Sequence, residues 1–116
     1  MPDTNNLLSL LEGYMLDNAD DIAKGMADDL RRRRIEKNIT RDQLAELSGV
    51  AVSNIVRFEQ KGLISLKNLI SLAMALGYTS ELKSVFAQPK YSTMEELTQI
   101  RKNSNKKKAH SVNNGQ

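Results

Sequence analysis

Two short amphipathic segments separated by three residues constrain the fold of this chain more than any other feature. The first covers residues 41–48, the second covers residues 52–60, and Gly49-Val50-Ala51 joins them. Thr40 and Gln43 have the spacing of a capping box, which predicts that a helix begins at Thr40. A glycine at the join permits a sharp turn. We therefore predict two short helices packed across each other through five apolar side chains: Leu44, Ala45, Val50, Ile55 and Phe58.

The rest of the chain also has helical periodicity, and no segment alternates as a strand would. Further helices are expected near 6–16, from Asn18 or Ala19 to about Lys37, over 66–76 after a Ser65 cap, over 80–86, and after Ser92 or Thr93. The pattern predicts that the helix after Asn18 has its apolar stripe at Ile22, Met26, Leu30 and Ile35. For the helix over 41–48 it predicts an inner face of Leu44, Ala45 and Leu47. The expected fold class is all-α.

Composition removes several classes of function. The chain has no cysteine and a single histidine, His110, so disulfides, thiolate metal sites and most catalytic triads have no residues to form them. No apolar run approaches the roughly 20 residues that span a bilayer, and the N-terminus lacks a basic signal-peptide start. Three nearby acids, Asp17, Asp20 and Asp21, lack the spacing of a calcium loop and read better as a helix start. We expect a cytoplasmic protein that is not an enzyme and needs no cofactor, metal or membrane.

The charges of the chain divide by position. Up to residue 29, seven Asp and Glu side chains accompany one lysine, Lys24. From Leu30 onward, sixteen Lys and Arg side chains accompany seven acids, so the two parts have formal charges of −6 and +9. A basic surface confined to one part of a small domain is what binding to a polyanion requires. This pattern favours a nucleic-acid partner, although a merely solvated charged face is the alternative.

From Leu30 to Leu82 the order of residues resembles the Xre, or λ-repressor, family of helix-turn-helix proteins. The resemblance is carried by Thr40, Leu44-Ala45, Gly49-Val50, Ile55 and Glu59, with Arg34 upstream and Lys61-Gly62 downstream. It implies a five-helix DNA-binding domain in which Arg34 and Glu59 form a structural ion pair, with a direct role of the pair in DNA contact as the alternative. We expect that domain over 18–88, an amphipathic extension over 1–17, a C-terminal helical extension over 89–102 and a disordered basic tail over 103–116.

The resemblance also implies which side chains contact DNA. The second helix of the motif enters the major groove with its first residues at base edges, which assigns base reading to Val52, Ser53 and Arg57. Arg57 has the strongest chemical case, because its guanidinium matches the paired acceptors of guanine. Contacts at the margin or to phosphates are expected from six other residues: Arg41, Ala51, Asn54, Lys61, Lys67 and Asn68.

Three of these positions depart from the family pattern. Family members often have glutamine where Arg41 and Val52 stand, and often serine where Ala51 stands. The departures leave the expected fold unchanged. They do mean that the target sequence of another member cannot be transferred to this chain.

Family members bind inverted repeats of double-stranded DNA as symmetric homodimers, because one domain reads few base pairs. By analogy the dimer surface consists of Leu76, Leu82, Val85 and Phe86, unless these side chains complete the core of one chain. The order of residues from Leu76 to Leu97 looks like the end of HipB-type antitoxins. That likeness implies a repressor of its own operon that also binds a HipA-like serine/threonine kinase toxin. The toxin-facing side chains would then be Leu7, Leu11, Tyr14, Met94 and Leu97, with packing onto the core or the second subunit as the alternative.

Two other functions stay open at this point. One is a phage-type or restriction-modification controller, which has the same fold without a toxin partner. A neighbouring gene for a kinase-like protein would distinguish it from an antitoxin. The other is a protein-binding adaptor that has lost DNA binding, against which the polar face of Ser53, Asn54 and Arg57 argues.

Overall fold

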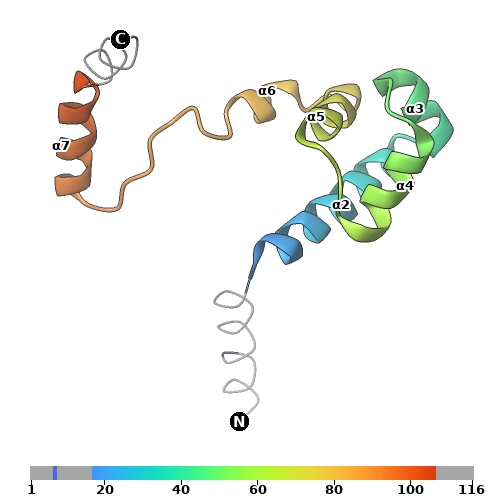
Figure 1. Cartoon of the computed structure of the whole chain (residues 1–116), viewed down its shortest axis with the longest axis horizontal. Coiled ribbons are helices and arrows are strands. Elements are labelled where there is room, and N and C mark those ends of the chain that lie inside the picture. The colour runs from blue at the N-terminus through green and yellow to red at the C-terminus, as the bar shows by residue number, and fades with distance from the viewer. Residues whose placement is uncertain (1–6, 8–16, 107–116) are drawn as a thin grey trace, which may run out of the picture. The chain divides into compact units, whose positions relative to one another are not determined.

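The computed structural model describes residue 7 and residues 17–106, and all regular structure in that part is helical (Figure 1). The chain divides into two units, residues 1–82 and residues 83–116. The first contains α2 (Ala19–Glu36), α3 (Arg41–Ser48), α4 (Val52–Lys61) and α5 (Leu66–Ala75), and α6 (Thr79–Lys83) ends at the boundary. The second contains α7 (Met94–Asn103). The all-α prediction is confirmed, and the helix expected near 6–16 falls outside the described residues except for Leu7.

Side-chain caps start four of these helices where the sequence predicts. The Asn18 side chain accepts a hydrogen bond from the Asp21 amide at 2.9 Å, and Thr93 caps α7 through the Glu96 amide at 3.1 Å. Thr40 and Gln43 form the full capping box, since each side chain accepts from the other residue's backbone N–H. Ser65 caps α5 by a single hydrogen bond, which its hydroxyl accepts from the Asn68 amide at 3.2 Å. Each cap satisfies an amide that the helix itself leaves without an acceptor, so these starts are encoded locally.

Glycine ends the two helices of the central pair. Gly49 after α3 and Gly62 after α4 have φ of +76° and +72°, a left-handed conformation in which a side chain is strained. Gly62 has a second constraint, because a Cβ there would lie 3.0 Å from the Lys24 backbone nitrogen of α2. The end of α4 therefore lies so close to the backbone of α2 that only glycine fits at residue 62.

The core lies among α2, α3, α4 and α5. α4 packs against both α2 and α3, and α3 packs against α5. Its buried side chains are Ala27, Leu30, Leu44, Val50, Ile55, Phe58, Leu72 and Leu76, with Ala45 packed against them. The five residues predicted to join the two short helices therefore all lie in or against this core. Removing these apolar surfaces from water is the main force that holds the short helices together.

The prediction for the buried face of α2 is wrong. Of its four residues only Leu30 is buried, whereas Ile22, Met26 and Ile35 are 56%, 45% and 49% exposed. α2 instead turns Ala27, Leu30 and Arg34 inward. The reason is the position of α4, since Gly62 approaches the backbone of α2 at Ala23 and Lys24, and the buried residues Ala27, Leu30 and Arg34 follow Ala23 at helical spacing on the same face.

Two further predictions need correction. Leu47 is 63% exposed rather than part of the inner face of α3. The helix expected over 80–86 is shorter, since α6 ends at Lys83. Residues 83–106, the described part of the second unit, contain no buried residue.

Candidate nucleic-acid interface

α4 presents two chemically different faces. Ile55, Phe58 and Glu59 are buried toward α2 and α3, whereas Ser53, Asn54 and Arg57 are exposed on the other side and Val52 is half-buried. Residues three and four apart share a helix face, so Ser53 and Asn54 both lie beside Arg57. The packed core thus fixes the rotation of α4, and that rotation exposes a polar row at the start of the helix.

Arg57 lies on this row without a partner. Its side chain makes no hydrogen bond or ion pair with any residue that the structure describes. An unpaired guanidinium on a rigid helix keeps its five N–H donors for a ligand. Of the three residues expected to read bases, Ser53 and Arg57 are exposed and Val52 is half-buried.

The start of α4 has no side-chain cap, because residue 51 is alanine. Ala51 is extended and exposed, so no side chain at that position accepts from the first amides of α4. These amides, together with the positive end of the helix dipole, favour an anion at this point. Because alanine stands where family members often have serine, the first amides of α4 have no side-chain cap and can donate to a ligand.

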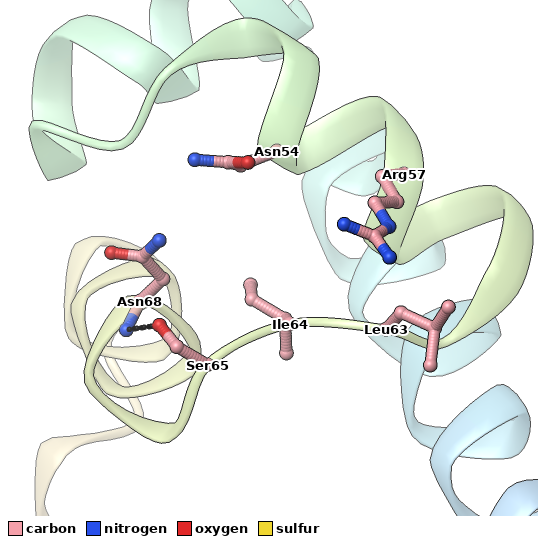
Figure 2. A pocket seen from close by; sticks show the side chains of 6 residues that line it. All are labelled: Asn54, Arg57, Leu63, Ile64, Ser65 and Asn68. Atoms are coloured by element: carbon pink, nitrogen blue, oxygen red, sulfur yellow. Dashed lines mark hydrogen bonds between the residues drawn. The ribbon is translucent and has the colours of Figure 1, made fainter.

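A pocket lies between α4 and the start of α5. Its lining residues are Asn54, Arg57, Leu63, Ile64, Ser65 and Asn68. Figure 2 shows Asn54 and Arg57 on α4 facing Ser65 and Asn68 at the beginning of α5, with Ile64 of the connecting loop between them. Ser65 accepts a hydrogen bond from the Asn68 amide at 3.2 Å, so its hydroxyl is already used as a cap. The fold brings these two expected margin residues, Asn54 and Asn68, to one hollow.

Two other residues expected to contact phosphates, Lys61 and Lys67, lie on the two helices that flank this hollow. Lys61 at the end of α4 and Lys67 in the first turn of α5 are both exposed. Neither ammonium group has a hydrogen bond or ion pair with a described residue. Both ammonium groups are therefore available to an anionic ligand.

Arg34 and Glu59 form the ion pair that the family resemblance implies, and it is buried. Arg34 Nε and Nη2 donate to Glu59 Oε2 and Oε1 at 2.8 and 3.0 Å, and Arg34 Nη1 donates to the Ile39 carbonyl at 2.9 Å. The Glu59 side chain is fully buried and that of Arg34 is 9% exposed. Burial acts to raise the pKa of Glu59, but hydrogen bonds from two arginines outweigh it and hold that pKa below its ordinary value.

Arg41 is the second of these arginines, which the sequence analysis did not connect with Glu59. Its Nε donates to Glu59 Oε1 at 2.9 Å, and its side chain remains 36% exposed. Lys24 also reaches this region, since its Nζ donates to the Glu59 carbonyl at 3.2 Å and pairs with Asp28 at 2.8 Å. Eighteen residues separate Arg41 from Glu59, so no local pattern indicates their contact.

The residues expected to form a dimer surface or the core separate in the structure. Leu76 is buried in the core and Leu82 is half-buried, whereas Val85 and Phe86 are 59% and 94% exposed. In the second unit Met94 is 72% exposed and Leu97 is half-buried. Of the N-terminal side chains considered for toxin binding, Leu7 is described and exposed, and Leu11 and Tyr14 lie outside the described residues.

Within the described residues, no group of three or more His, Asp or Glu side chains is placed to hold a metal ion. Asp20 and Asp21 occupy the first turn of α2, beside the Asn18 cap. No helix in the same part of the chain has the length and apolarity to cross a membrane.

Comparison with protein families matches residues 30–82 to a family described as helix-turn-helix. The matched segment runs from the second half of α2 through α6 and contains both the α3–α4 pair and the polar row of α4. Over residues 30–82 the chain is thus similar to helix-turn-helix proteins, and the match supports a DNA-binding regulator of transcription. No curated protein matches the chain.

Proposed function

We propose that this protein is a sequence-specific transcriptional repressor that binds an inverted-repeat operator as a homodimer. The observation that carries the proposal is the unpaired Arg57 on the exposed row of α4, inside the segment that matches the helix-turn-helix family. In such motifs the second helix lies in the major groove with this row against base edges. Val52 and Ser53 complete the reading surface. The methyl groups of Val52 can contact a thymine methyl, and the hydroxyl of Ser53 can hydrogen-bond to any base.

Backbone contacts flank this surface on two sides. Asn68 lines the pocket between α4 and α5, the exposed Lys61 and Lys67 lie at the end of α4 and the start of α5, and the uncapped amides lie at the start of α4. Contacts of this kind set the register of a protein on DNA, while the base contacts supply the sequence preference. Since one domain reads few base pairs, two copies are needed, and of the side chains expected at the dimer surface Val85 and Phe86 are the exposed ones.

The first experiment is a mobility-shift titration against the DNA upstream of the protein's own gene, with an unrelated duplex as competitor. We expect saturation at two chains per operator and an affinity that falls steeply with salt, because bound Lys and Arg release counterions. Equal affinity for the two duplexes would contradict sequence-specific binding and would favour the protein-binding adaptor.

Arg57→Ala tests the reading surface. It should weaken operator binding by roughly 1–3 kcal/mol per half-site and relax the preference at one base pair. The matched control is Arg32→Ala on α2, which removes the same charge from a side chain paired only with Asp29 and pointing away from the inward residues Ala27, Leu30 and Arg34. If both variants lose the same affinity, Arg57 acts through charge alone and is not a reader.

We further propose that this repressor is a cytoplasmic antitoxin of the HipB type. The support is the likeness of residues 76–97 to such proteins and the exposed apolar Met94 on α7, outside the helix-turn-helix segment. Met94→Lys should abolish co-purification with a HipA-like kinase encoded beside the gene while operator binding persists. A genome without such a neighbour would favour a phage-type or restriction-modification controller.

A further inference from the structure

One buried carboxylate receives hydrogen bonds from two arginines on different helices. Glu59 Oε1 accepts from Arg34 Nη2 at 3.0 Å and from Arg41 Nε at 2.9 Å, and Oε2 accepts from Arg34 Nε at 2.8 Å. The Glu59 side chain has no exposed surface. Its orientation is therefore determined by the packing of α4 against α2 and α3, and not by solvent.

Two guanidinium groups against one carboxylate leave one positive charge without a counterion in this cluster. Arg34 is almost buried and also donates to the Ile39 carbonyl, so it has little surface to offer a ligand. Arg41 is 36% exposed and contacts Glu59 through Nε alone. Its terminal Nη groups make no hydrogen bond with a described residue. The uncompensated charge is therefore presented to solvent by Arg41.

The position of Arg41 suits a backbone contact. It is the first residue of α3, directly after the Thr40 cap, and α3 is the first helix of the helix-turn-helix pair. In such motifs the first helix crosses the DNA backbone. A guanidinium held by Nε can donate from its terminal nitrogens to phosphate oxygens, which an ammonium group cannot do in the same way.

We propose that Glu59 is a positioning residue for DNA binding, because it holds Arg41 with its terminal N–H groups presented to a backbone phosphate. This inference rests on the proposed DNA-binding function. Because Glu59 already holds the long Arg41 side chain, part of the side-chain entropy of Arg41 is lost when the protein folds. Less of that entropy is then lost when DNA binds. A buried carboxylate that stabilises the fold thereby also sets the geometry of one phosphate contact.

Arg41→Ala tests the phosphate contact, measured on the upstream duplex and on an unrelated duplex at several salt concentrations. Because Arg34 still pairs with Glu59, this variant keeps the buried ion pair. We expect about a tenfold loss per half-site on both duplexes, the size of one charge-assisted hydrogen bond. The slope of log affinity against log salt should fall by about one per half-site. An unchanged slope would overturn the proposal.

A double-mutant cycle tests the role of Glu59 itself. Glu59→Gln should weaken DNA binding when Arg41 is present and cause no further loss in the Arg41→Ala background, while lowering the melting temperature in both. An equal loss of DNA affinity in both backgrounds would mean that Glu59 acts through the fold alone, which overturns the proposal. Arg32→Ala again serves as the charge control.

Arg41→Lys gives a second route if Glu59→Gln does not fold. Lysine keeps the charge, so the salt slope should stay the same, but a single ammonium cannot both bond Glu59 and present a separate pair of donors. We expect a several-fold loss of affinity, and wild-type affinity would overturn the proposal. If the wild-type chain prefers neither duplex, the proposed repressor function is wrong. The slopes of log affinity against log salt on the two duplexes still decide whether Arg41 contacts phosphate. Absence of binding to either duplex overturns both.

Discussion

Replacing Glu59 with alanine should destabilise the helix-turn-helix domain more than any change to a surface charge. The variant leaves the Arg34 guanidinium buried with a single acceptor, the Ile39 carbonyl. It also removes the link that ties α4 to both α2 and α3 through Arg34 and Arg41. Deleting one partner of a buried ion pair costs about 3–5 kcal/mol, because the other charge stays buried without compensation.

This loss is large beside the total stability of a small domain, which is about 5–15 kcal/mol. At roughly 4–8 °C per kcal/mol for a domain of this size, the melting temperature should fall by at least about 12 °C. Thermal and urea unfolding followed by circular dichroism measure the change. The Arg34→Met/Glu59→Leu double variant should lose less than Glu59→Ala, since it leaves no charge of the pair unpaired.

The matched control is Glu46→Ala on α3, which removes an exposed glutamate and should change stability by less than about 0.5 kcal/mol. A loss below about 1 kcal/mol for Glu59→Ala would refute the reasoning. That result would mean that water reaches Arg34 and screens the pair as it screens a surface salt bridge.

Three further predictions follow from the local geometry. The pKa of Glu59 is lowered from its ordinary value of 4.5, so its contribution to stability should be complete above about pH 4.5. That contribution should be lost as the pH falls through the lower pKa of the folded state. Acid unfolding of the wild-type chain should therefore be steeper than that of Glu59→Gln. Thr40→Ala removes the capping box and should lower the free energy of unfolding by about 1 kcal/mol in urea titrations, whereas Thr40→Ser should keep most of it. Gly49→Ala adds only the strain of a positive φ, which costs about 1 kcal/mol of stability. Gly62→Ala must also displace the backbone of α2, so it should lower stability clearly more. Equal melting temperatures for the two glycine variants would contradict the close approach of Gly62 to α2.

The helix starts were predictable because each depends on residues within one turn. Asn18, Thr40, Ser65 and Thr93 each accept a hydrogen bond from an amide three residues ahead. A polar side chain at the right spacing is sufficient for such a cap, whatever the rest of the chain does. The two central helices and their apolar contacts were also predictable, since the family pattern covers both in one continuous stretch.

The buried face of each helix was less predictable. Ile22, Met26 and Leu47 follow a helical period with buried neighbours, yet all three are exposed. Periodicity identifies an apolar side of a helix, but the neighbouring helices decide which part of that side is covered. For α2, the close approach of Gly62 makes that decision, and a glycine at the end of α4 does not reveal which helix it will contact.

The sequence by itself determined the helical class, the caps and the expected reading helix, because these depend on local spacing and on a motif of adjacent residues. Only the tertiary structure decided what the charged side chains do. Arg41 has the sequence character of a phosphate contact, and the fold places it on Glu59 as well. Arg57 has the same chemistry, and the rotation of α4 leaves its side chain without a partner among the described residues. The charge of an arginine is a local property, but the carboxylate that neutralises it comes from wherever the chain folds back.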